Sequence, residues 1–455
     1  MNARRDTTVT SDQAPSRDPV PARPMAVLRR GLPTGWRAYV LLLVVFTVIA
    51  APLIGWKAVH NRQLSVFDEW QYVDRVHQVS TGDFVIRDGQ RISAWGHRQL
   101  TCRGILRVVE PQPDRCDDPH KRAPNPNSAA SDPPTYFWTT GVATRAVLVT
   151  GLTDNVVTAA RLVGIGWAVL AMLSVYLLAR TLGAGRTASF LAGSTQVFVP
   201  VFAQQYTYVT PHALDVPVGA LVVIATIRWM RGQGRWWTLV LAGALTALSK
   251  GTNITVVVAM SVFLLAVLAW PGTFDRAMRM RALRGGLLLG GSAVASTVLW
   301  MVIVDLMRKA TYAPPGDYFV DSLDPAALAV DAIRFVAPFG DAGMLFFGTF
   351  LMSAMTGAAL VRWAGLSDGG PLLRPLAAGY VVGATLAPLV LAFLVFVTTD
   401  QYIGTQLRYG LALWPLGLAF AALLLRTRTA VGLAGVFLVA YWAMPFVWNL
   451  DGITF

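Results

Sequence analysis

Two adjacent carboxylates, Asp68 and Glu69, follow the first long apolar segment of the chain in the stretch SVFDEWQYVDRVHQ, residues 65–78. A carboxylate beside a reacting hydroxyl group can take its proton, which is general-base catalysis. The pair also has a structural interpretation. Ser65 with Asp68 three residues later has the spacing of a capping box, and acids in a first helical turn suit the helix dipole. The stretch alone leaves both interpretations open.

Polar groups also border other apolar segments, in DPPTYFW (132–138), QQYTYVTPHALD (204–215), ALSKGTN (247–253) and TDQYIGTQLRYGLALWPL (399–416). Lys250 and Arg408 are cations that could bind a phosphate, and the Arg408 guanidinium offers several donors in a fixed fork. Asp215 opens an apolar segment, where an acid usually faces a cavity or a partner. Acids, cations and aromatic residues together favour a site that binds a lipid phosphate and activates a hydroxyl group.

Each of these residues also has a plainer interpretation. The aromatic residues of DPPTYFW could anchor a helix at the membrane interface, and so could Arg408 with Tyr409. Asp215 could balance a helix dipole, and His212 could be a hydrogen-bonded packing residue. Lys250 could extend to the interface along its own apolar stem.

The composition indicates a membrane protein. Of the 455 residues, 55% are hydrophobic and 14% are charged, whereas soluble domains carry about 25% charged residues. The net charge of +13 could fit nucleic acid, but the arginines fall in short clusters between apolar segments. Nucleic-acid binding would need a basic patch gathered on one face. We therefore expect the lipid bilayer as a partner and no nucleic acid.

The pattern predicts an all-α polytopic membrane protein, a bundle of about eleven transmembrane helices. The predicted spans are 37–58, 155–179, 187–205, 212–230, 237–250, 254–270, 285–307, 344–363, 375–397, 408–425 and 429–448. With a cytoplasmic N-terminus, every arginine cluster lies on the cytoplasmic side, as the positive-inside rule requires. Residues 1–36 are then a disordered cytoplasmic tail, and 37–455 are the transmembrane domain of a plasma-membrane protein. The candidate residues meet at the extracytoplasmic face.

Two large extracytoplasmic loops are predicted, 59–154 and 308–343. An apolar stripe in the first loop predicts an amphipathic juxtamembrane helix on the membrane surface. The stripe consists of Phe67, Trp70, Val73 and Val76. The segment 133–150 is apolar but contains Arg145, and a membrane crossing there would invert every later loop. We therefore expect it to be a helix against the outer leaflet.

Both cysteines of the chain, Cys102 and Cys116, lie in the first loop. Outside the cytosol, two cysteines in one loop most simply form a disulfide. A zinc site with His97 and His120 is the alternative, but the spacing fits no familiar ligand pattern. The prediction is therefore a disulfide and no structural metal site.

The order of these segments resembles the GT-C superfamily of glycosyltransferases, within it the protein O-mannosyltransferase and aminoarabinose-transferase-like branch. The resemblance covers roughly residues 37–260 and returns at 400–420. It is carried by the acidic pair, DPPTYFW, AARLVGIG, YLLARTLG, VTPHALD, ALSKGTN and QLRYGLALWP, the last of which also looks like an actinobacterial membrane family. One departure is Asp132, which stands where the family pattern has a histidine before the proline pair.

The resemblance implies a sugar donor linked to polyprenyl phosphate and a glycan, glycolipid or protein acceptor in cell-wall biogenesis. Asp68 would be the general base, and Glu69 would orient the acceptor or share that role. The donor phosphate would be bound by Lys250, Arg408 and Tyr409. Substrate binding would involve Tyr136, His212, Asp215 and Gln406. No cofactor is expected, with a divalent metal as the alternative.

Two other functions compete with this one. A transporter or flippase for lipid-linked sugars also needs a polar cavity in an apolar bundle, but would more naturally show polar residues at mid-span and inverted repeats. A non-catalytic assembly partner of a cell-wall enzyme would keep the fold without needing the acids and cations.

Overall fold

The computed structural model describes residues 35–447, apart from 67, 86, 88, 107, 116–126, 271, 309–324, 336–341, 367–369, 400, 401 and 403. The described part of the chain is helical and contains no strand, which confirms the predicted all-α fold. Cys116, most of the second predicted loop and almost all of the predicted tail lie outside the described residues. The disulfide and the tail therefore stay predictions.

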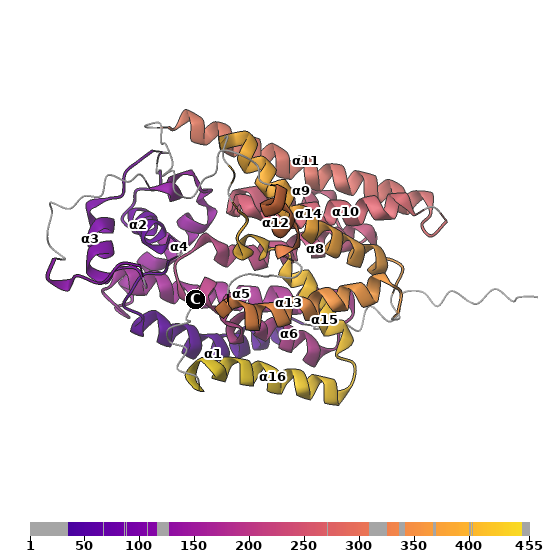
Figure 1. Ribbon diagram of the computed structural model, residues 1–455, viewed down its shortest axis with the longest axis horizontal. Coiled ribbons are helices and arrows are strands. Elements are labelled where there is room, and N and C mark those ends of the chain that lie inside the picture. The colour runs from indigo at the N-terminus through magenta and orange to yellow at the C-terminus, as the bar shows by residue number, and fades with distance from the viewer. Residues whose placement is uncertain are drawn as a thin grey trace, which may run out of the picture.

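Figure 1 shows a bundle of long helices with a smaller group of helices, α2, α3 and α4, at one end. The bundle consists of α1 (Trp36–His60), α5 (Val156–Leu182), α6 (Arg186–Phe198), α7 (Pro200–Thr207), α8 (Asp215–Met230), α9 (Trp236–Ser249), α10 (Ile254–Ala269), α11 (Arg276–Leu306), α13 (Ala342–Trp363), α14 (Leu373–Thr399), α15 (Trp414–Leu424) and α16 (Arg428–Val447). The end group comprises α2 (Glu69–Ser80), α3 (Ala94–Arg103) and α4 (Pro134–Val149). Helix α12 (Pro325–Arg334) lies in the second predicted loop.

Among the described residues, 6 helices are long and apolar enough to cross a membrane, and α9, α15 and α16 are shorter apolar helices. The predicted number of about eleven spans is not confirmed. The predicted span 187–205 is interrupted, because α6 ends at Phe198 and α7 begins at Pro200, whose nitrogen has no hydrogen to continue the ladder. The predicted span 408–425 starts as the 3₁₀ turn η7 (Leu407–Gly410) and becomes an α-helix at Trp414.

Helix α2 is buried on its polar side as well as along its apolar stripe. Val73 and Val76 are buried, but Asp74 and Gln78 on the polar side are buried as well. The Asp74 carboxylate accepts hydrogen bonds from Gln78 Nε2 at 2.9 Å and from Asn127 Nδ2 at 3.2 Å. Protein partners thus satisfy the polar side of α2, which packs between protein segments.

Close backbone contacts hold the segment around η7. Gly219 of α8 faces Ala412, and a Cβ at this glycine would lie 1.9 Å from the Ala412 carbonyl oxygen. A Cβ at Gly410 would lie 2.9 Å from the ring of Phe335, which follows α12. Only glycine permits such approaches. The turn η7 is therefore held between α8 and the α12 segment.

Candidate active site

Asp68 has the only left-handed backbone conformation among the non-glycine residues that the structure describes, with φ 59° and ψ 16°. Aspartate tolerates this region better than most residues, but the conformation still costs about 1 kcal/mol or more. The capping box expected from Ser65 is not formed. Asp68 is itself the N-cap of α2, its side chain makes no capping hydrogen bond, and its carbonyl accepts from the N–H of Gln71 at 2.9 Å. The carboxylate is left for other contacts.

One further acid, Asp132, and two cations, Arg408 and Lys250, lie near this carboxylate. Arg408 Nη2 is 3.6 Å from Asp68 Oδ2, and their side chains are 13% and 41% exposed. Lys250 Nζ donates to both carboxylate oxygens of Asp132, at 2.7 and 2.8 Å. Lys250 also lies over the ring of Tyr72, in the first turns of α2, with 5.6 Å from Nζ to the ring centroid. We refer to Asp68, Arg408, Asp132 and Lys250 as the four-charge cluster.

Segments far apart in the sequence position the second ion pair. Lys250 directly follows α9, and Asp132 stands between the 3₁₀ turn η3 (Ser128–Ser131) and α4. The Asp132 carbonyl accepts a hydrogen bond from Arg75 of α2 at 2.8 Å. The Ser131 carbonyl accepts one from Trp300 Nε1 of α11 at 2.9 Å. The backbone of Asp132 is therefore fixed from two sides.

The surroundings of Asp68 suit a proton acceptor. Burial raises the pKa of Asp68, although the positive charges of Arg408 and Lys250 act in the opposite direction. A carboxylate with a raised pKa is a stronger base than an ordinary aspartate. Its partial exposure leaves it accessible to a bound molecule. The cluster can thus accept a proton at one end and bind an anionic group with its two cations.

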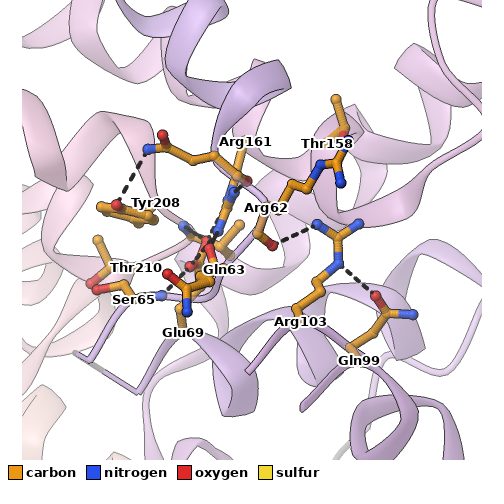
Figure 2. Close-up of polar contacts among 12 residues, drawn as sticks. Arg62, Gln63, Ser65, Glu69, Gln99, Arg103, Thr158, Arg161, Tyr208 and Thr210 are labelled. Carbon is orange, nitrogen blue, oxygen red and sulfur yellow. Dashed lines mark hydrogen bonds and ion pairs between the residues drawn. The ribbon is translucent and has the colours of Figure 1, made fainter. Parts of the chain in front are cut away.

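Glu69 differs from its neighbour Asp68 in that it lies beside Arg161, among protein donors (Figure 2). Its side chain is fully buried, and Arg161 of α5 donates to each of its carboxylate oxygens at 2.8 Å. The N–H groups of Ser65 and Val209 also donate to it, at 2.7 and 3.0 Å. Protein donors therefore occupy both of its oxygens. The predicted role of Glu69 in orienting an acceptor or sharing the base role stays a prediction.

Arg161 extends this buried contact into a network that joins several elements. It also donates to the carbonyl groups of Asn61 and of Gln63, the latter at 2.8 Å, just after α1. Arg103 of α3 donates to the Arg62 carbonyl at 3.1 Å (Figure 2). Arg161 lies in the AARLVGIG segment and was not among the predicted site residues, although a charge inside an apolar segment is itself a signal.

Three residues predicted to bind substrate are buried instead. Tyr136 and Asp215 are 1% exposed and His212 is 2% exposed. The Tyr136 hydroxyl accepts a hydrogen bond from the Thr210 N–H at 3.0 Å, and His212 Nδ1 lies 2.6 Å from Asp215 Oδ2. Almost none of their surface is accessible, and their observed partners are protein groups. Their contact with substrate stays a prediction.

The other two predicted residues flank Arg408. The Tyr409 ring stacks on the buried His212 ring with centroids 5.9 Å apart, and it lies 5.6 Å from the Arg408 guanidinium carbon. It thereby connects the buried His212–Asp215 pair to the four-charge cluster. Gln406 is exposed immediately before η7. In the described part of the chain, no group of three or more His, Cys, Asp or Glu residues could hold a metal ion.

Comparison with known proteins supports the resemblance seen in the motifs. Residues 131–300 match the dolichyl-phosphate-mannose-protein mannosyltransferase family. The fold is similar to that of ArnT from Cupriavidus metallidurans bound to undecaprenyl phosphate, with a TM-score of 0.51 and 17% identity over 91% of this chain. It is also similar to the apo state of that protein, with a TM-score of 0.50 and 16% identity over 90% of this chain.

The chain spans 66% and 65% of the length of those two ArnT chains. No curated protein matches it. At this identity the likeness concerns the fold, and it confirms the predicted GT-C-type membrane bundle.

Proposed function

We propose that this chain is an inverting glycosyltransferase that moves a sugar from a polyprenyl-phosphate donor to an acceptor hydroxyl group. The observation that carries the proposal is the four-charge cluster. It combines an accessible carboxylate of raised pKa, at a strained backbone position, with two cations. Strain of this kind is retained mainly at functional sites. The family match and the ArnT-like fold support transferase chemistry at a lipid phosphate.

In the proposed reaction, Asp68 takes the proton of the acceptor hydroxyl group. The acceptor oxygen attacks the anomeric carbon from the side opposite the phosphate, so the configuration inverts. The bond from that carbon to the phosphate oxygen breaks, and its electron pair leaves with the polyprenyl phosphate. Arg408 and Lys250 stabilise the negative charge that develops on this phosphate. Tyr409 holds the Arg408 guanidinium in position.

The proposed location is the extracytoplasmic face of the plasma membrane. Helix α9 follows Arg235 at one end and precedes Lys250 at the other, and α8 runs from Asp215 to the end that carries Arg231. The four-charge cluster and the group of Arg228, Arg231 and Arg235 therefore lie at opposite ends of these helices. Under the positive-inside rule the arginine ends are cytoplasmic. A glycan, glycolipid or protein outside the cytoplasm would then supply the acceptor hydroxyl group.

The proposed function is tested by donor turnover. The purified protein in nanodiscs would be given a panel of polyprenyl-phosphate sugars with a glycan or membrane extract as acceptor. Release of free polyprenyl phosphate together with a glycosylated product is the expected result. Passage of the lipid-linked sugar across a liposome bilayer without its cleavage would instead establish the transporter or flippase.

The raised pKa of Asp68 predicts the pH dependence of transfer. The base acts only when deprotonated, so kcat/KM should fall on acidification through a pKa above that of an ordinary aspartate. Arg408→Gln removes a charge that lowers this pKa, so the acid limb should move to still higher pH. The measurement is kcat/KM against pH for both proteins. An identical acid limb in both would contradict the assignment of Asp68 as the base.

Arg408→Gln should also weaken donor use directly. Loss of a charged donor to the phosphate is expected to lower kcat/KM by about 10- to 100-fold. Arg428→Gln is the matched control, because Arg428 is an exposed arginine that begins α16, away from η7. Equal kinetics of the two variants would show that Arg408 is only an interfacial anchor.

A further inference from the structure

Asp132 brings a second carboxylate into the four-charge cluster, at the position where the family pattern has a histidine. Both of its oxygens accept hydrogen bonds from Lys250, and the two side chains are 18% and 12% exposed. One of the two cations assigned to the donor phosphate is therefore already paired. Asp132 has no role in the reaction proposed above.

Within this ion pair, the Lys250 side chain can move more easily than the Asp132 side chain. The carbonyl groups of Asp132 and Ser131 are held by Arg75 and Trp300, so the Asp132 carboxylate stands on a fixed backbone. The Lys250 ammonium is a compact charge on a flexible four-carbon stem. A phosphate that enters the cluster can attract the ammonium, but the carboxylate cannot easily follow.

Lys250 needs a counter-ion when no phosphate is bound. A largely buried ammonium without a partner carries a high desolvation penalty. Asp132 supplies this counter-ion through two hydrogen bonds, at 2.7 and 2.8 Å. Asp132 thus keeps the lysine charged in the empty site.

We propose that Asp132 is a positioning residue, a fixed counter-ion that holds Lys250 in the empty site and competes with the lipid phosphate for it. The inference rests on the proposed function. The donor phosphate is a diester with one negative charge, whereas the released polyprenyl phosphate is a monoester that can carry two. Repulsion by the carboxylate is therefore stronger for the product than for the donor. Asp132 thereby promotes product release.

The test is the affinity for undecaprenyl phosphate, measured with the purified full chain in nanodiscs. Asp132→Asn keeps the shape and removes the charge, and the dissociation constant should fall by about tenfold. In turnover assays with a polyprenyl-phosphate sugar, product inhibition should increase and kcat should fall more than kcat/KM for the donor. Asp132→Glu retains the charge and should restore affinity toward the wild-type value.

Asp305→Asn is the matched control for net charge, because Asp305 is an acid with a 69% exposed side chain near the end of α11. Its affinity for undecaprenyl phosphate should equal that of the wild type. Unchanged or weaker binding by a folded Asp132→Asn variant would overturn this inference and leave the proposed function intact. Failure of the wild-type protein to bind undecaprenyl phosphate would overturn both.

Discussion

Asp68→Asn is expected to reduce sugar transfer by about 10²- to 10⁴-fold, the usual contribution of a general base. Binding of the lipid donor should be retained, because Arg408 and Lys250 remain. Asparagine is also among the residues most tolerant of a left-handed backbone, so the strained turn at φ 59° should persist. The substitution therefore removes the proton acceptor with little effect on the fold. The measurement is release of polyprenyl phosphate under saturating donor, together with the donor dissociation constant.

Asp83→Asn provides the matched control for this experiment. Asp83 is an exposed acid in the segment that follows α2, so its substitution makes the same chemical change in the same loop. It should leave transfer unchanged. Equal turnover by wild type and Asp68→Asn would instead assign Asp68 a structural role and leave the base unidentified.

The adjacent acids Asp68 and Glu69 show that the sequence alone does not determine the environment of each residue in a site. Both residues were predicted to be catalytic, yet Asp68 is partly exposed beside Arg408 and Glu69 is fully buried. Neighbouring positions at a helix start point in different directions, but their environment depends on distant partners. Arg161 lies 92 residues from Glu69 in the chain, and spacing within one segment carries no information about that contact.

The predictions that held depend on composition along single segments. Long apolar runs predicted the helical bundle, and the helix at 133–150 is present as α4. The features that the sequence did not predict depend on partners elsewhere in the chain. The buried polar side of α2 is satisfied by Asn127, and the pairing of Lys250 with Asp132 joins residues 118 positions apart. The change from histidine to Asp132 was visible in the sequence, but its consequence required the position of Lys250.

Glu69→Gln is expected to destabilise the protein by about 3–5 kcal/mol, because it leaves the Arg161 guanidinium buried without a counter-charge. Arg161 is 1% exposed and joins α5 to Gln63, just after α1, and to Glu69, the first residue of α2. The end group that carries Asp68 should therefore loosen from the bundle. The measurement is the midpoint of thermal unfolding in detergent, followed by size-exclusion chromatography of a fluorescently tagged protein.

The double variant Glu69→Leu with Arg161→Met distinguishes a structural ion pair from a catalytic acid. Removing both charges also removes the uncompensated guanidinium, which is the larger cost. The N–H groups and carbonyls that bonded Glu69 and Arg161 lose these partners, which costs less than an unpaired buried charge. The double variant should therefore unfold at a higher temperature than Glu69→Gln and retain transfer activity per folded molecule. A Glu69→Gln variant that keeps its unfolding temperature but loses transfer would reverse the assignment. Glu69 would then belong to the catalytic machinery, and the role of Asp68 as the sole base would fail with it.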